Sequence, residues 1–206
     1  MIKETLPGIF SWSEYNEEKK LDFNGLLIIG KGESVIIDPP DLAKDDEAEL
    51  KNIIDSHSSC PLKGVLLTNV HHERASGLLK EKFSVPVWVN NLDKEALETS
   101  TDKTFIGGDT LFCGIQAIQL EHQKSPGETA FYIADQKIMI LGDALIGKFP
   151  GQLNMLPPEK YQDPEKAKAS LNQLLDYDFE TLLVGDGSSI LKGAKEAVKN
   201  FLANWL

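Results

Sequence analysis

The chain has 206 residues, of which 41% are hydrophobic and 26% charged, a composition typical of a folded globular protein. Its 21 basic and 32 acidic residues give a formal net charge of −11, which argues against nucleic acid and anionic membranes as partners. No stretch approaches the roughly 20 apolar residues of a membrane span, and the N-terminus lacks the apolar core of a secretory signal, so we expect a cytoplasmic protein.

The first half of the chain predicts a hairpin, a helix and further strands. Two apolar runs, Leu26 to Ile29 and Ser34 to Asp38, flank the pair Lys31-Gly32, a pattern typical of a β-hairpin. Apolar residues then recur at three- and four-residue spacing from Leu42 to Ile54, which predicts a helix with Asp41 as its N-cap. A buried strand, a short helix and another strand follow, at GVLLT (residues 64 to 68), Glu73 to Lys80 and PVWV (residues 86 to 89).

The second half repeats this plan. A strand from Ile115 to Leu120 precedes a hairpin of AFYIA and KIMILGD, whose turn is Asp135-Gln136. The segment DPEKAKASLNQLLDYD predicts a helix that Asp163 caps and Pro164 begins. The run TLLVGDG predicts the next strand. The closing helix has an apolar face of Leu191, Ala194, Val198, Phe201, Leu202 and Trp205.

The two halves place polar residues at equivalent strand ends. Asp38 and the pair Thr68-Asn69 end strands of the first half, and Asp143 and Asp186 end strands of the second. The carboxyl ends of buried strands are where open α/β sheets place their sites. The sequence therefore predicts an α/β fold in one domain, residues 1–206, with two sheets face to face and helices outside.

Six short segments carry a more specific signal. In chain order they are Asn24 within DFNGLLI, SVIIDPP with Asp38, LLTNVHHERASG, KSPGE, KIMILGD and LLVGDG. Their order and spacing resemble the metallo-β-lactamase superfamily, which includes glyoxalase II and lactonases, and the likeness covers nearly the whole chain. The resemblance implies a four-layer αββα sandwich and descent from hydrolases of small esters, thioesters, lactones or lactams.

The metal-binding motifs of that family are altered here. The resemblance implies T-H-x-H-x-D-H after the first buried strand, a His in an S/T-P-G turn, an Asp after a later strand and a final His near the last strand. The corresponding residues of this chain are Asn69, His71, Glu73, Arg74, Lys124, Asp143 and Asp186. Only His71 and Asp143 keep the residue type that the family uses.

The replacements follow a chemical pattern. Two metal-ligand positions hold cations, Arg74 and Lys124, and a guanidinium has no lone pair to offer a metal ion. These cations would supply fixed positive charge opposite the carboxylates of Glu73, Asp143 and Asp186. The leading interpretation is a degenerate site with no cofactor, which acts as a pseudo-enzyme or binds a small anionic molecule. Asn69, Arg74 and Lys124 would contact that ligand.

An enzyme remains the alternative. His71, Asp143 and Asp186 could hold one divalent ion, Mn, Fe, Mg or Zn, in a hydrolase of small esters, thioesters or lactones. Glu73 would then serve as a general base beside Asp143. His122, two residues before Lys124, is a further candidate ligand. In both interpretations the partner is a small molecule.

The remaining polar residues have simpler explanations. His72 points away from His71 if the segment is extended, so we expect it on the surface. Asp38 is expected to bind nearby backbone amides and shape the loop. Cys60 and Cys113 lack metal-ligand spacing, and we expect a reduced, partly buried pair.

Overall fold

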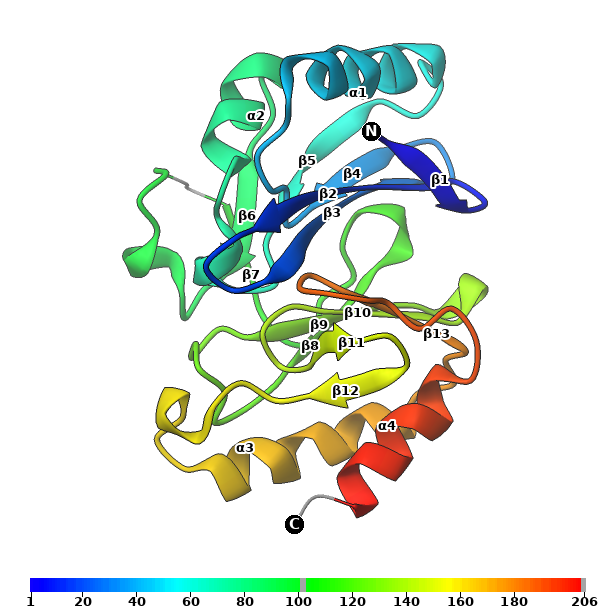
Figure 1. The fold of residues 1–206 in the computed structure, drawn as a ribbon. Coiled ribbons are helices and arrows are strands. Elements are labelled where there is room, and N and C mark those ends of the chain that lie inside the picture. The colour runs from blue at the N-terminus through cyan, green and yellow to red at the C-terminus, as the bar shows by residue number, and fades with distance from the viewer. Residues whose placement is uncertain (101–102, 205–206) are drawn as a thin grey trace.

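The computed structural model describes residues 1–100 and 103–204 and has four layers: helices, sheet, sheet and helices (Figure 1). Helices α1 (Lys44–Ser56) and α2 (Ser76–Phe83) cover one sheet, and α3 (Pro164–Ser170) and α4 (Ala194–Ala203) cover the other. The predicted αββα sandwich is thus confirmed. Trp205, assigned to the closing helix from the sequence, lies outside the described residues.

The first sheet has seven strands that lie in chain order. Strands β1 to β4 pair antiparallel and β4 to β7 pair parallel, so the predicted hairpin around Lys31 forms, with Ile29 opposite Ser34. The strands are β1 (Lys3–Leu6), β2 (Ile9–Asn16), β3 (Leu21–Ile29), β4 (Ser34–Ile37), β5 (Leu62–Leu66), β6 (Val87–Asn90) and β7 (Lys103–Phe105). Strands β1, β2 and β7 have no counterpart among the elements predicted from the sequence.

The second sheet has four strands in the order β13-β10-β9-β8, with β10 and β13 parallel and the other pairs antiparallel. The hairpin of β11 and β12 stands apart from it. These strands are β8 (Gln116–Gln119), β9 (Thr129–Ile133), β10 (Ile138–Leu141), β11 (Ile146–Phe149), β12 (Gln152–Asn154) and β13 (Thr181–Val184). Short 3₁₀ turns lie at Val70–His72, Lys94–Ala96, Phe112–Gly114, Ala134–Gln136, Pro158–Lys160 and Leu171–Asp176.

Apolar side chains fill the three spaces between the four layers. Leu50 of α1 and Leu79 of α2 pack on the outer face of the first sheet, in one buried cluster. Phe131 belongs to the cluster between the two sheets. Leu171 and Val198 belong to the cluster beneath the second sheet. Because all five side chains are fully buried, these layers form a rigid support for the loops at the strand ends.

Local departures from the expected elements have identifiable causes. Helix α1 begins at Lys44 with Ala43 as its N-cap, so the assignment of that cap to Asp41 was wrong. Helix α2 begins three residues later than expected, since Arg74 has a φ of 35°, a left-handed conformation that interrupts a helix. The Asp163 cap is confirmed, since its Oδ1 accepts a hydrogen bond from Lys166 N at 3.1 Å.

Other expectations from the sequence can be compared directly with the structure. Cys60 and Cys113 are free and half-buried. None of the helices among the described residues is long and apolar enough to cross a membrane.

Candidate functional site

Four strand ends bring polar side chains together at one edge of the sandwich. Strands β4 and β5 are parallel neighbours in the first sheet, and Asp38 and Thr68 follow them. Strands β10 and β13 are parallel neighbours in the second sheet, with Leu141 opposite Val184. Asp143 and Asp186 each lie two residues beyond that matched pair. The parallel pairing therefore places their carboxylates at the same end of the sheet.

Asn24 of β3 connects the two sheets beside this edge. Its backbone N–H donates to Gly185 O at 2.7 Å, and its side-chain Nδ2 donates to Val184 O at 2.8 Å and Gly187 O at 2.7 Å. These three bonds hold the loop after β13, which carries Asp186. The sequence DFNGLLI thus has a structural role that is visible in the contacts.

Asp38 has the scaffold role expected from the sequence. Its carboxylate accepts hydrogen bonds from Thr68 N at 2.8 Å, from Thr68 Oγ1 at 2.6 Å and from His72 Nδ1 at 2.8 Å. The side chain is buried, and its backbone has a φ of 47°, unusual for a residue with a Cβ. Asp38 therefore fixes both the end of β5 and the buried imidazole.

His72 is at the centre of the site, and its expected position on the surface was wrong. The expectation assumed an extended segment, whereas residues Val70–His72 form a 3₁₀ turn that directs His72 inward. Its side chain is 1% exposed, while His71 is exposed to solvent. The imidazole packs so closely on the last strand that a Cβ on Gly185 would meet His72 Cε1 at 2.4 Å.

His72 carries a positive charge in this environment. Burial and the nearby Arg74 charge lower its pKa, but Asp38 and Asp143 outweigh both and raise the pKa of His72 to about 10. Its Nε2 lies 3.6 Å from Asp143 Oδ1 and 3.9 Å from Asp186 Oδ1, attractive distances that are too long for hydrogen bonds. An imidazolium therefore stands between two carboxylates.

Arg74 forms an ion pair with Asp186. Its Nη2 is 2.5 Å from Asp186 Oδ1, and the two side chains are 12% and 10% exposed. The guanidinium also stacks over Phe23, with 4.0 Å from Cζ to the ring centroid, a favourable cation–π contact. The sequence analysis placed a cation opposite this carboxylate, and the structure brings the two together.

Lys124 forms the corresponding ion pair with Asp143. Its Nζ lies 2.7 Å from Asp143 Oδ2, with the lysine 25% and the aspartate 6% exposed. Burial raises the pKa of Asp143, but His72 and Lys124 together outweigh burial and hold that pKa below its usual range. His122, the other candidate in this turn, is exposed.

Glu128 is a buried acid that the sequence analysis missed. It is 0% exposed, and its Oε1 accepts a hydrogen bond from Ala144 N at 3.2 Å. Burial, reinforced by the Asp143 charge, raises the pKa of Glu128 well above its ordinary value, which favours the protonated form. Its position after the KSPG turn, directly before an apolar strand, was the available signal.

Carboxylates and cations pair with one another at this centre. The carboxylates are those of Asp38, Asp143 and Asp186, and the cations are His72, Arg74 and Lys124. Every one of these carboxylates contacts at least one cation. We refer to these six residues as the ion-pair centre.

Three predicted site residues lie around this centre rather than within its ion pairs. Asn69 is buried, and its Oδ1 accepts a hydrogen bond from His71 N at 2.8 Å. Partial burial and then the Lys124 charge lower the pKa of His71. The carboxylate of Glu73 accepts hydrogen bonds from the amides of Glu98 and Thr99. Glu73 is thus engaged with the loop that carries Glu98 and Thr99.

Asp93 is a second residue that the sequence analysis missed. Its Oδ2 accepts hydrogen bonds from Val70 N at 2.9 Å and from Ser125 Oγ, and its Oδ1 accepts from Gly127 N at 2.8 Å. The side chain is 1% exposed. Asp93 therefore fixes the loop of His72 relative to the turn of Lys124.

The residues do not fit a dinuclear metal centre. Zinc ligands lie about 2.0 to 2.3 Å from the ion, and a protonated amine or guanidinium cannot take such a place. One group of side chains could still hold a single metal ion, since ligand atoms of His72, Asp143 and Asp186 lie within 4.8 Å of one another. His72 thus occupies the place that the sequence analysis gave to His71. An ion there would require His72 to lose its proton beside the Arg74 guanidinium.

A hollow of about 580 Å³ opens beside the ion-pair centre. His71, Glu73 and Arg74 line it from one side, and Ala96, Glu98 and Thr99 from the other. Arg74 Nη1 is buried and has no hydrogen-bond acceptor among the described residues, and the same holds for Asn69 Nδ2, which lies beside Gly142. We call this space the entrance hollow.

Comparison with known proteins supports the fold. A family profile described as metallo-beta-lactamase superfamily matches residues 1–205. An uncharacterized protein of Aquifex aeolicus (strain VF5) is 28% identical over 55% of this chain and 60% of its own length. The chain thus spans less than two thirds of that relative.

Solved structures of metallo-β-lactamases superimpose well at low sequence identity. The DIM-1 enzyme exposed to ceftazidime gives a TM-score of 0.78 at 18% identity, with 98% of this chain and 96% of that chain covered. A metallo-β-lactamase from Pontibacter korlensis gives 0.76 at 16% identity, with 100% and 99% covered. A metallo-β-lactamase family protein from Thermus thermophilus gives 0.69 at 16% identity, with 97% and 80% covered. At these identities the likeness concerns the fold.

Proposed function

The chain belongs to the metallo-β-lactamase superfamily, and within it we propose a non-hydrolytic protein whose fixed cations replace metal ions and whose entrance hollow binds a small anion. One observation carries this proposal: Arg74 and Lys124 each form a close ion pair with a carboxylate of the site. Carboxylates gathered in a poorly solvated site repel one another unless positive charge lies among them. Here side chains supply that charge.

Two buried donors of the site favour an anionic ligand. Arg74 Nη1 and Asn69 Nδ2 are buried without acceptors among the described residues, and leaving such donors unpaired costs roughly 1 to 3 kcal/mol each. A carboxylate on a small molecule can accept charge-assisted bonds from a guanidinium and an amide. Lys124, a quarter exposed, adds positive charge that also acts on His71, a residue of the wall of the hollow.

Metal content tests the first part of the proposal. After dialysis against zinc or manganese and gel filtration, the protein is expected to retain well under one equivalent per chain, measured by elemental analysis. The Lys124→His variant restores an imidazole at this position, and Lys31→His is its matched control because Lys31 is 94% exposed in a hairpin turn. If both variants stay free of metal, replacement of metal charge by side chains is supported.

A different result would favour the second candidate, a single-metal hydrolase. The compatible group of His72, Asp143 and Asp186 is the observation behind it. In that case the parent protein would retain about one tightly bound ion per chain and hydrolyse simple esters, thioesters or lactones. Both properties would disappear in His72→Gln. That outcome would refute the non-hydrolytic assignment.

Anion binding tests the second part. Titration with acetate or succinate at constant ionic strength is expected to shift the amide resonances of Val70 and His71 in a saturable way. Lys124→Met should bind at least about ten-fold more weakly, because a hydrogen bond to a charged group contributes about 1.5 to 3 kcal/mol. Lys31→Met is the control and should bind like the parent. Identical binding by the parent and Lys124→Met would contradict the proposed ligand site.

A further inference from the structure

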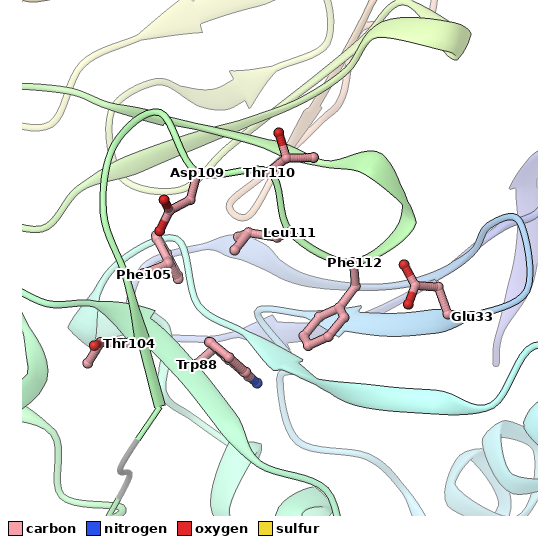
Figure 2. A pocket seen from close by; sticks show the side chains of 8 residues that line it. All are labelled: Glu33, Trp88, Thr104, Phe105, Asp109, Thr110, Leu111 and Phe112. Atoms are coloured by element: carbon pink, nitrogen blue, oxygen red, sulfur yellow. The ribbon is translucent and has the colours of Figure 1, made fainter.

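A second cavity, of about 420 Å³, is lined by Trp88 of β6, by Thr104 and Phe105 of β7, and by the loop that carries Asp109, Thr110, Leu111 and Phe112 (Figure 2). Glu33 lines it and immediately precedes β4, whereas Asp38 of the ion-pair centre follows β4. The four residues of β4 lie between these positions, and the five residue steps of extended chain correspond to roughly 17 Å. The cavity is therefore distinct from the entrance hollow.

Aromatic side chains form much of its wall. Trp88 of β6 and Phe112 meet edge to face, with ring centroids 5.4 Å apart and an interplanar angle of 83°. Phe105 of β7 lines the cavity and packs edge to face on the buried Phe131, at 5.6 Å. Each such contact favours one ring orientation, so the wall is largely preformed.

The charged groups at this cavity are both acids. Glu33 and Asp109 lie on opposite sides of the labelled group, with Leu111 and Phe112 between them (Figure 2). Glu33 Oε1 accepts a hydrogen bond from Cys113 N at 2.6 Å, and Asp109 Oδ2 accepts one from Ile106 N at 2.9 Å. These bonds fix both carboxylates in place. The second oxygen of each has no hydrogen bond or ion pair within residues 1–100 and 103–204.

Aromatic faces and unpaired carboxylates together complement one class of ligand. An organic ammonium ion is attracted by a carboxylate and by the face of an indole or phenyl ring, and its apolar body can pack against Leu111 and the rings. None of the eight lining side chains is cationic, so an anionic ligand would find no counter-charge there. We propose that this cavity binds a small organic ammonium ion that carries an aromatic or alkyl group.

Three probes of similar size distinguish the contribution of charge to binding from that of apolar packing. They are 2-phenylethylammonium, 2-phenylethanol and 3-phenylpropionate. Binding is followed by NMR at the Trp88 indole N–H and the Cys113 amide. The ammonium probe is expected to shift both resonances and to bind at least ten-fold more tightly than the alcohol. The carboxylate probe should leave both resonances unchanged.

Glu33→Gln and Asp109→Asn test the two carboxylates directly. Each variant keeps an oxygen that can accept the existing backbone hydrogen bond, so the local fold is retained. Each should weaken binding of the ammonium probe at least ten-fold. Glu18→Gln is the matched control, since Glu18 is 83% exposed, and should bind like the parent. Equal affinity for the alcohol and the ammonium probe, or unchanged affinity in both test variants, would overturn the proposal.

Discussion

Arg74→Ala is expected to lower the free energy of unfolding by about 3 to 5 kcal/mol at neutral pH, the range for breaking a buried ion pair. Both partners are almost buried, with Arg74 12% and Asp186 10% exposed, so solvent screens the pair only weakly. The substitution leaves Asp186 without the guanidinium and also removes the contact with the Phe23 ring. Urea unfolding at constant ionic strength measures the effect.

Two further variants identify the source of that loss. Arg74→Ala combined with Asp186→Asn removes both charges, and it should be more stable than Arg74→Ala alone because no unpaired carboxylate remains. Lys51→Ala is the surface control: Lys51 and Asp55 are 56% and 59% exposed, and loss of this pair should change stability by about 0.5 kcal/mol or less. An Arg74→Ala effect as small as that of the control would show that the centre does not depend on this ion pair.

The order of secondary-structure elements was accessible from the sequence because buried strands and amphipathic helices leave local periodic patterns. The hairpin around Lys31 and the helix begun by Asp163 are examples. Strand β1, of four residues with none buried, leaves no such pattern. The start of α2 depends on the left-handed backbone of Arg74, which periodicity does not reveal.

The site was partly predictable for a different reason. Arg74 and Lys124 stand at positions where the family has metal ligands, which predicted that their positive charges would face carboxylates. In the structure Arg74 contacts Asp186 and Lys124 contacts Asp143. His71 was proposed as a ligand from its place in the family motif, and His72 was expected on the surface because an extended chain was assumed. A 3₁₀ turn occurs there instead and directs His72 inward, so the expected position of His72 was wrong.

Asp93 and Glu128 were not predictable because their roles arise from tertiary contacts. Asp93 binds two loops that are distant in sequence, with Val70 23 residues before it and Gly127 34 residues after it. The raised pKa of Glu128 comes from its burial and from the Asp143 charge, and its position directly before an apolar strand hints at the burial but not at the nearby carboxylate. Residues that hold other side chains or loops in position by tertiary contacts can be recognised only when the three-dimensional positions of the loops are known.

Stability is also expected to fall as pH rises from about 7 to 10, because of His72. The pKa of this group is raised from 6.5 to about 10 in the folded protein. A group whose pKa is raised by folding stabilises the fold fully below its unfolded pKa, and that contribution is lost as pH rises through the folded pKa. One pKa unit corresponds to about 1.4 kcal/mol, so a loss of several kcal/mol is expected.

Urea unfolding at pH 6, 7, 8, 9 and 10 measures this dependence, with His72→Gln and His57→Gln as test and control. The His72→Gln variant starts from lower stability but should have a much flatter profile, since it has no imidazolium to lose between Asp38 and Asp143. His57 is not part of the ion-pair centre, so His57→Gln should keep the slope of the parent.

A divalent ion bound by His72, Asp143 and Asp186 would reverse the expected pH dependence of stability. A metal ligand must be neutral imidazole, so metal affinity rises with pH. A parent protein that gains stability between pH 6 and 8 only when zinc or manganese is present would therefore favour the single-metal hydrolase, whereas a steady loss that added metal does not change supports an imidazolium held by carboxylates.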